Sequence, residues 1–278
     1  MTRRDGVLVT GGTGTLGTEL TSLVGERANT ALRLVSRNAP PALVPPHEEW
    51  LRLDLLRDTL EPALEGTRAV IHLASSKTAS DQDERACRRL LAAAEATGVA
   101  HFVVISIIGC DRIPLPFYAT KVAVEAAVRE NRVPWSIVRV SQFHSFVARL
   151  IELAQASPIP TPFVHDLRFQ PVDEREVAEA LLAIALGEPL GNAPDVAGPE
   201  LLTLGEIASA WFAVTGRPDR LVPVAAATLL ESDSTSSRDA RPVLEGYREA
   251  WNTPHGPRTL GRVRFIEWLE RRFATSSR

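Results

Sequence analysis

The hydrophobic positions in the first half of the chain form short continuous runs, separated by stretches with helical spacing. None of these runs alternates apolar with polar residues, so each is expected to be a strand buried on both faces, as in a parallel sheet covered by helices. The runs that predict strands are 7–10, 32–35, 50–53, 69–73, 101–107 and 135–140. This alternation of strands and helices predicts a doubly wound α/β fold.

Helices are expected between these strands and through the second half of the chain. Thr203, with Glu206 three residues later, predicts a capping box at the start of a helix that runs to Val214. The Ser- and Asp-rich stretch at 231–239 predicts a mobile loop or a lid. Helical spacing of apolar or strongly helix-forming residues predicts the other helices at 15–27, 83–97, 121–130, 145–156, 174–186 and 262–273.

Composition narrows the class of protein. The chain has 278 residues, of which 45% are hydrophobic and 23% charged, which is typical of a globular protein. A net charge of −3 lacks the basic excess of a nucleic-acid or anionic-membrane surface. No apolar run reaches the roughly 20 residues of a membrane helix. Two cysteines favour a reducing cytoplasmic location, and the six histidines show no metal-ligand spacing.

A glycine-rich turn directly after the first predicted strand is the sharpest local motif. Its glycines are spaced three apart and open a predicted helix. Glycines let the backbone approach a pyrophosphate, and a helix N-terminus offers free N–H groups at the positive end of its dipole. A dinucleotide cradle is therefore expected, with a glycine turn that binds nothing as the alternative. Its expected contacts are Gly11, Thr13, Gly14, Thr15, Leu16 and Gly17.

The end of the second predicted strand indicates which dinucleotide binds. Arg37 stands 20 residues after the last glycine of the turn, and no acidic residue occurs between 31 and 46. An acidic residue here usually binds the ribose of NAD, whereas an arginine suits the 2′-phosphate of NADP. We therefore expect NADP (NADPH), held by Arg37 with Ser36, although a solvated arginine is the alternative. Asp54 and Leu55 are expected near the adenine, or Asp54 caps the next turn.

Longer segments give the chain a family resemblance, which runs from about residue 7 to residue 214. Together with the glycine pattern, they resemble the atypical short-chain dehydrogenases, and most closely the NmrA-like NAD(P)H-binding group. The segments are HLASS at 72–76, ISIIGCDRIPLPFYATK at 105–121, VPWSIVRVSQFH at 133–144 and QPVDEREVAEAL at 170–181. The resemblance implies a Rossmann-like core, expected at 1–156. A sheet edge and a small C-terminal substrate-binding lobe are expected at 157–278, interleaved with the core.

The resemblance also implies residues on the cofactor's ribose. Ala74, Ser75 and Ser76 follow the fourth predicted strand and would line the cofactor. Lys121 matches the active-site lysine of the family and would hold the ribose beside the nicotinamide. A surface lysine at a helix start is the alternative for Lys121.

The residues that would meet the substrate come from the ends of later strands. Ser106 matches the family's serine at the end of the fifth strand and would polarise a substrate oxygen, or it is a plain turn hydroxyl. Gln142, Phe143 and His144 would border the nicotinamide and the substrate. Trp251 is expected to form a pocket wall.

One departure from the family pattern concerns the proton donor. Short-chain dehydrogenases carry a tyrosine four residues before the lysine, but Phe117 stands there, and Tyr118 is only three residues before Lys121. Tyr118 serves only if the helix begins later or its register shifts; otherwise Phe117 packs against substrate or core. His144 is the other expected proton donor, with a helix-entry histidine bonded to backbone as the alternative.

These patterns predict an enzyme, an NADPH-dependent reductase of a carbonyl or conjugated double bond in a small organic molecule. The alternatives are a non-catalytic NAD(P)-sensing regulator that docks a protein partner, and an NADP-assisted epimerase or isomerase. A monomer or homodimer is expected, with a small-molecule substrate and no nucleic-acid or membrane partner.

Overall fold

The chain folds into two compact units that alternate along the sequence. Unit 1 comprises Met1–Ser106, Pro116–Arg139 and Arg175–Ala193, and unit 2 comprises Ile107–Leu115, Val140–Glu174 and Pro194–Arg278. The expected division of function between 1–156 and 157–278 stays a prediction. The structure, a computed structural model, describes residues 5–25, 30–40, 43–46, 48–76, 81–157, 161–230 and 235–274.

Unit 1 is built on a sheet in the order β6-β5-β4-β1-β2-β3, with β9 beside β6. The strands are β1 (Asp5–Thr10), β2 (Thr30–Ser36), β3 (Glu48–Arg52), β4 (Thr67–His72), β5 (His101–Ile107), β6 (Trp135–Val140) and β9 (Gly191–Asn192). The pairs β1–β2, β1–β4, β2–β3, β4–β5 and β6–β9 are parallel. Strand order reverses between β1 and β4, and such a switch point opens a crevice at the carboxyl ends of the strands.

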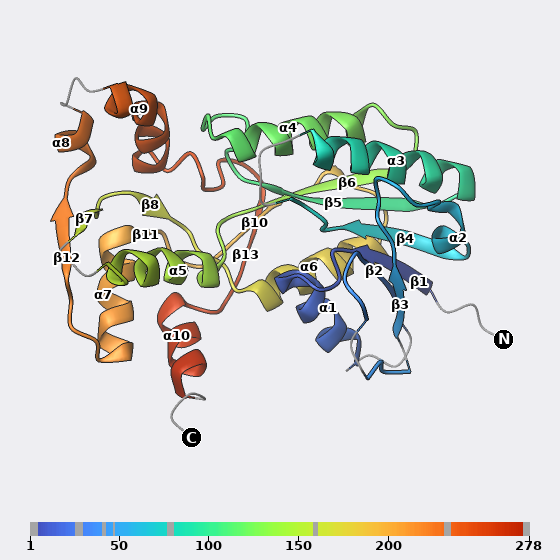
Figure 1. Ribbon diagram of the computed structural model, residues 1–278, viewed down its shortest axis with the longest axis horizontal. Coiled ribbons are helices and arrows are strands. Elements are labelled where there is room, and N and C mark those ends of the chain that lie inside the picture. Colours follow the sequence, from blue (N-terminus) through green and yellow to red (C-terminus); the bar gives the residue numbers. More distant parts are fainter. Residues whose placement is uncertain are drawn as a thin grey trace. The chain divides into compact units, whose positions relative to one another are not determined.

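Helices cover both faces of this sheet, which is why its strands read as continuous apolar runs. Helices α1 (Thr15–Gly25) and α6 (Glu174–Leu186) lie on one face, and α3 (Gln82–Thr97) and α4 (Pro116–Arg129) on the other (Figure 1). The short helix α2 (Glu61–Leu64) packs against α3. Successive residues of β1, from Val7 to Val9, are all buried although they face opposite sides. The expected Rossmann-like, doubly wound fold is confirmed.

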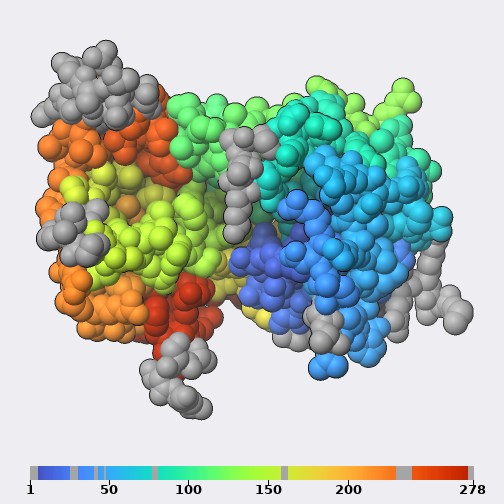
Figure 2. All heavy atoms as spheres, viewed as in Figure 1, coloured from blue at the N-terminus to red at the C-terminus, as the bar shows by residue number. Residues whose placement is uncertain are grey.

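The first part of unit 1 is closely packed. Leu8, Leu90 and Phe102 belong to one buried apolar cluster that joins β1, α3 and β5. In the space-filling view, the atoms coloured from blue to cyan form one continuous surface on this face (Figure 2).

Unit 2 contains short strands and five helices among its described residues. Strands β10 and β13 are parallel, and Val196 of β10 pairs with Val140, the last residue of β6. Helix α7 packs against α5 and α10 around the fully buried Trp211. The elements are β7 (Thr161–Val164), β8 (Arg168–Phe169), β10 (Asp195–Ala197), β11 (Leu202–Thr203), β12 (Leu221–Val224), β13 (Arg258–Leu260), α5 (His144–Gln155), α7 (Leu204–Thr215), α8 (Ala226–Leu230), α9 (Thr235–Arg248) and α10 (Phe265–Ala274).

The predicted strands match the observed ones to within two residues at each end. The predicted capping box is confirmed, because the Glu206 N–H donates to Thr203 Oγ1 over 3.2 Å and the Thr203 N–H donates to Glu206 Oε2 over 2.7 Å. The predicted helix at 121–130 was placed too late, since α4 begins at Pro116. Proline suits the first position of a helix, where its missing N–H costs no hydrogen bond.

Two further expectations need correction. The loop or lid expected at 231–239 is wrong for 235–239, which form the first turn of α9, whereas 231–234 lie outside the described residues. Ser and Thr favour helix starts as well as loops, so composition alone did not separate the two. The last helix begins at Phe265 and not at Arg262, with the Arg264 N–H donating to Glu267 Oε2. Among the described helices, none has the length and apolar character that crossing a membrane requires.

Candidate functional site

A cavity of about 270 Å³ lies in unit 1 at the carboxyl ends of β1, β2, β3 and β4. Its walls are the turns that follow these strands and the first residues of α3. This is the crevice that a doubly wound sheet offers to a ligand. The lining residues are Thr10, Gly11, Thr13, Gly14, Val35, Ser36, Arg37, Asn38, Leu53, Asp54, Leu55, Leu56, Leu73, Ala74, Ser75, Ser76, Gln82, Asp83 and Ala86.

The glycine turn forms one edge of this cavity. Gly11 has a φ of 73°, and its N–H donates to the Val35 carbonyl over 3.0 Å. The Gly14 N–H in turn donates to the Gly11 carbonyl over 2.9 Å. A Cβ on Gly17 would lie 2.4 Å from the Gly12 oxygen, so only glycine lets α1 start this close to the turn. The backbone thus leaves room for a phosphate at the N-terminus of α1.

Most of the predicted cofactor residues line the cavity, but a few do not. Thr15 and Leu16 form the start of α1, where Leu16 and Gly17 are buried under the turn. Lys121 lies on α4 and reaches the cavity wall through Ser75, as described below.

A polar corner of the cavity surrounds the end of β2. Thr13 Oγ1 and Ser36 Oγ are 3.2 Å apart, and the Asn38 side-chain amide lies 3.4 Å from Thr13 Oγ1. The Asn38 N–H donates to Ser36 Oγ over 3.1 Å. Beside them, the exposed Arg37 guanidinium has neither an ion pair nor a hydrogen bond to any residue that the structure describes. A cation without a carboxylate, next to three neutral polar groups, suits a phosphate.

Sequence reasoning missed several residues of this cavity. Arg52 does not line the cavity but supports its polar corner: it lies opposite Ser36 in the β2–β3 register, and its Nε donates to the Arg37 carbonyl over 3.2 Å. Only the strand order could have placed it there. Asn38 directly follows Arg37 in the sequence, so it could have been predicted as a cavity residue from that position. Asp83, at the start of α3, had no signal in the sequence beyond that of a helix start.

Asp54 has the second of its two expected roles. Its Oδ1 accepts the Leu56 N–H over 2.9 Å, so it caps the turn after β3. It also lines the cavity next to Leu55. A contact from Asp54 to an adenine stays a prediction.

Lys121 is not a surface lysine at a helix start. It is buried in the second turn of α4, with Nζ 3.3 Å from Ser75 Oγ and 5.4 Å from the centre of the Phe117 ring. Because α4 already begins at Pro116, the later helix start that favoured Tyr118 is not found. Phe117 lies over the ammonium at the position where the family carries its tyrosine, and Tyr118 is buried in the helix. Tyr118 as a proton donor stays a prediction.

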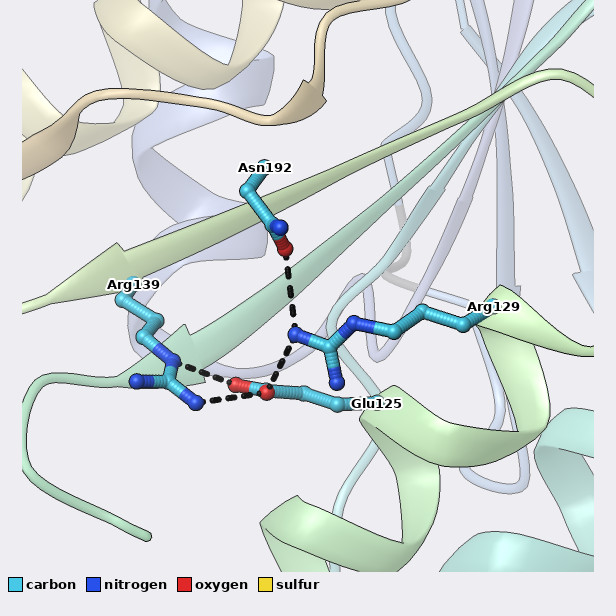
Figure 3. Close-up of polar contacts among 4 residues, drawn as sticks. All are labelled: Glu125, Arg129, Arg139 and Asn192. Carbon is cyan, nitrogen blue, oxygen red and sulfur yellow. Dashed lines mark hydrogen bonds and ion pairs between the residues drawn. The ribbon is translucent and has the colours of Figure 1, made fainter.

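Ser106 faces a buried carboxylate. Its hydroxyl hydrogen-bonds to Glu125 of α4, which also accepts from Arg139 Nε and Nη2 over 2.8 Å each and from Arg129 over 3.0 Å (Figure 3). Arg129 bonds in addition to Asn192 Oδ1. A carboxylate only accepts, so the single hydroxyl hydrogen of Ser106 is directed to Glu125. This geometry favours the plain structural hydroxyl, and a role in polarising substrate stays a prediction.

His72 ties two strand ends together beneath the cavity. Its Nδ1 lies 2.8 Å from Thr10 Oγ1, which also accepts the Ala74 N–H over 3.2 Å. Burial, and then the charge of Lys121, lower the pKa of His72 to about 4, although Asp83 opposes this shift. The imidazole is therefore neutral at neutral pH.

This lowered pKa predicts a pH-dependent stability. Unfolded His72 takes up a proton below about pH 6.5, but the folded protein does so only near pH 4, so stability falls as pH drops through this window. Between about pH 7 and about pH 5 the loss from this residue is roughly 2 kcal/mol. Urea unfolding of the wild type and His72→Gln at both pH values measures it. A His72→Gln variant that loses as much stability as the wild type would contradict the assignment.

In unit 2, His144 is the helix-entry histidine bonded to backbone that was the alternative to a proton donor. It is the first residue of α5, is fully buried, and its Nε2 lies 3.1 Å from the Val263 carbonyl oxygen. The rings of Phe265 and Trp268 from α10 lie 5.5 and 5.7 Å from its own. These rings enclose the imidazole. A proton-donor role for His144 stays a prediction that this geometry does not favour.

The other expected substrate residues in unit 2 hold segments together. Gln142 Oε1 accepts from Asn252 Nδ2 over 3.0 Å. Phe143 is the half-buried N-cap of α5. Trp251 is half-buried under the Arg112 guanidinium, 4.8 Å from the ring centre. Their contact with a substrate stays a prediction.

Comparison with known families shows which class of cofactor this chain binds. The family model described as NAD(P)H-binding matches residues 11–185, from the glycine turn to the last turn of α6. The chain belongs to this NAD(P)H-binding family. The match confirms the expected NAD(P)H-binding family, with which an NmrA-like short-chain dehydrogenase is consistent, and the expectation of a nicotinamide dinucleotide. The residues fit that cofactor, because the turn approaches its neighbours too closely for a Cβ on Gly11 or Gly17, and the Arg37 guanidinium beside it has no ion pair among the described residues.

Two curated relatives of this family member are reductases. A (4-alkanoyl-5-oxo-2,5-dihydrofuran-3-yl)methyl phosphate reductase of Streptomyces griseus is 29% identical over 77% of this chain and 75% of that protein. An NAD(P)H azoreductase of Xenophilus azovorans is 29% identical over 78% of this chain and 77% of that protein.

Solved structures show the same fold. An NADPH-dependent quinone oxidoreductase of Escherichia coli, solved with NADPH, has a TM-score of 0.73 at 17% identity and covers 96% of this chain and 99% of its own. A nucleoside-diphosphate-sugar epimerase of Staphylococcus aureus has a TM-score of 0.72 at 16% identity, covering 95% of this chain and 99% of its own. At such identities the likeness concerns the fold alone.

Proposed function

We propose that this protein is an NADPH-dependent reductase of a carbonyl or conjugated double bond in a small organic molecule. The observation that carries the choice of NADPH is the Arg37 guanidinium, which has no partner among the described residues and lies beside Thr13, Ser36 and Asn38. The two curated relatives, both named as reductases, support reduction over epimerisation. The epimerase likeness rests on the fold, which hosts many chemistries.

The residues divide the work of binding and orientation. The glycine turn and the N-terminus of α1 take the pyrophosphate, and Arg37 takes the 2′-phosphate. Lys121 holds the ribose next to the nicotinamide. The bound cofactor supplies the hydride, and the protein supplies position and charge.

The side chains around Lys121 favour a particular kind of acceptor. Phe117 brings no hydroxyl to the tyrosine position, and the Ser106 hydroxyl is directed to Glu125. A simple ketone needs a proton donor as the hydride arrives, because its alkoxide is a strong base. A quinone or an enone delocalises the added electron pair over a conjugated oxygen, and water can then supply the proton. We therefore favour conjugated acceptors over simple ketones.

Turnover assays test the proposal. The purified protein is mixed with NADPH or NADH and with a quinone, an enone, an azo dye or a simple ketone, while the absorbance of the reduced cofactor is followed. We expect NADPH to be consumed with the conjugated acceptors and far more slowly with the ketone. Binding of NADPH without consumption by any acceptor would favour the sensor alternative. Conversion of a sugar nucleotide without net cofactor oxidation would favour the epimerase.

Arg37→Ala tests the choice of cofactor. Losing a charge-assisted contact to the 2′-phosphate should weaken NADPH binding by about a hundredfold and leave NADH binding within about twofold. Quenching of tryptophan fluorescence gives both dissociation constants. Arg132→Ala, at another exposed arginine of unit 1 that does not line the cavity, is the matched control. Equal weakening of NADPH and NADH by Arg37→Ala would show that Arg37 does not read the 2′-phosphate.

A further inference from the structure

A buried carboxylate, an intervening hydroxyl and the Lys121 ammonium form a continuous hydrogen-bonded chain in unit 1. Asp83 Oδ1 accepts the Ser76 N–H over 2.7 Å, and its Oδ2 lies 2.6 Å from Ser75 Oγ. Lys121 Nζ donates to the same Ser75 oxygen over 3.3 Å. Ser75 Oγ also lies 3.3 Å from the Ser76 carbonyl oxygen. The turn after β4 and the start of α3, which are neighbours in sequence, therefore meet the distant helix α4 at one serine.

The direction of each hydrogen bond follows from the groups involved. A serine hydroxyl has one hydrogen to donate and two lone pairs to accept with. Its contact with the Asp83 carboxylate is the shorter and charge-assisted one, so the hydrogen points to Asp83. The oxygen then accepts from Lys121. This series of hydrogen bonds runs from a cation through a hydroxyl to an anion, and in each of its two bonds a donor faces an acceptor.

This series of hydrogen bonds from Lys121 through Ser75 to Asp83 lies beside the cavity that is proposed to bind the cofactor. Ser75, Ser76 and Asp83 line the dinucleotide cavity. Asp83 is 7% exposed and Lys121 8%, so both charges are largely removed from water. On another side, Phe117 offers Lys121 the face of its ring and no hydroxyl. The two charges also act on the nearby His72, because Lys121 lowers the pKa of its imidazole and Asp83 raises it.

We propose that Asp83 is a positioning residue, which holds the Lys121 ammonium through the Ser75 hydroxyl where the ribose next to the nicotinamide binds. This inference rests on the proposed function. A lysine side chain has many rotamers, and fixing it in one of them before the cofactor arrives lowers the entropic cost of binding. Where the family's tyrosine is missing, the Ser75–Asp83 pair orients the lysine.

Two probes separate the two halves of the cofactor. NADPH contains the ribose next to the nicotinamide, whereas adenosine 2′,5′-bisphosphate contains only the half that meets the glycine turn and Arg37. Asp83→Asn keeps an oxygen for the Ser76 N–H but turns an N–H toward Ser75, which reverses the donor direction. Ser75→Ala removes the bridging oxygen and carries the test should Asp83→Asn fail to fold, which thermal melting checks.

We expect Asp83→Asn and Ser75→Ala each to weaken NADPH binding by about tenfold, and the double variant to be no weaker than Ser75→Ala alone. Binding of the bisphosphate should stay within about twofold. Arg37→Ala, which should weaken both probes, checks that the fragment binds in the same cavity. If Asp83→Asn and Ser75→Ala weakened the binding of NADPH and of the bisphosphate equally, the role of these residues would be merely structural. Unchanged NADPH binding in both variants would show that Asp83 does not position Lys121. A wild type that bound neither probe would instead overturn the proposed function, and this inference with it.

Discussion

We expect Glu125→Ala to lower the free energy of unfolding by about 3 kcal/mol, because it leaves two partly buried guanidinium groups without their shared anion. The Glu125 side chain is 1% exposed, and those of Arg139 and Arg129 are 24% and 39% exposed. Arg139 binds both carboxylate oxygens, with Arg129 on the second (Figure 3). Because water still reaches both arginines, the loss should lie at the low end of that for buried ion pairs. Chemical denaturation measures it.

A more exposed ion pair in the same unit is the control. Glu84→Ala removes a pair with Arg88 in which the two side chains are 31% and 47% exposed, against 1% for Glu125, and should cost under about 1 kcal/mol. Similar losses for Glu84→Ala and Glu125→Ala would mean that the cluster in Figure 3 is no stronger than a solvated pair.

Glu125, like His72, also makes the stability of the protein depend on pH. Burial alone would raise the pKa of Glu125, but hydrogen bonds and charge from Arg139, with help from Ser106 and Arg129, hold it below its ordinary value of 4.5. The folded pKa is thus lower than the unfolded one, so the stabilisation is present at neutral pH and is lost as pH falls below 4.5. The difference in stability between the wild type and Glu125→Gln should therefore narrow in acid.

The second large effect is expected for Gly17→Ala. The added Cβ would lie 2.4 Å from the Gly12 oxygen and 2.7 Å from the Gly11 oxygen, both of them backbone atoms of the cradle. Either α1 or the turn must move, at a cost of about 3 kcal/mol in stability. Since the displaced turn is the phosphate cradle, NADPH binding should weaken by more than about tenfold. Thermal melting and fluorescence titration measure the two losses.

Substitutions of two other glycines, with smaller expected losses of stability, test this prediction. A Cβ on Gly14 meets one backbone oxygen at 3.2 Å, and a Cβ on Gly256 meets nothing within 4 Å. The loss of stability should therefore rise from Gly256→Ala through Gly14→Ala to Gly17→Ala. A Gly17→Ala protein as stable as Gly256→Ala would show that the turn adapts and that its close approach is not required.

Local features of the fold were predictable from the sequence. The strands around Val7, Ile71 and Val103 are buried on both faces, so each reads as an apolar run without help from the rest of the chain. The glycine turn and Arg37 also lie within one β-α-β stretch, where spacing along the chain determines position in space. The start of α4 was misplaced because Pro116 can open a helix as well as interrupt one.

Contacts between distant segments could not be predicted. Lys121 and Ser75 are 46 residues apart, and His144 and Val263 are 119 apart. The sequence around Lys121 or His144 gives no sign of the distant residue that contacts it. His144 looked like a proton donor because nothing near it in the sequence shows that α10 covers its ring. Pairing of this kind depends on the order of the strands and the packing of helices, which single residues do not encode.

The alternation of the two units also affects the protein while it is being synthesised. Every residue that lines the dinucleotide cavity has been made once the ribosome passes Ala86, yet unit 1 continues to Ala193. Helix α6 covers one face of the sheet with residues that are fully buried, such as Val177 and Leu181 (Figure 1). A nascent chain that ends at residue 156 leaves this apolar surface open to water. We therefore expect such fragments to need chaperones and to bind no cofactor, so that the cradle becomes functional only late in translation.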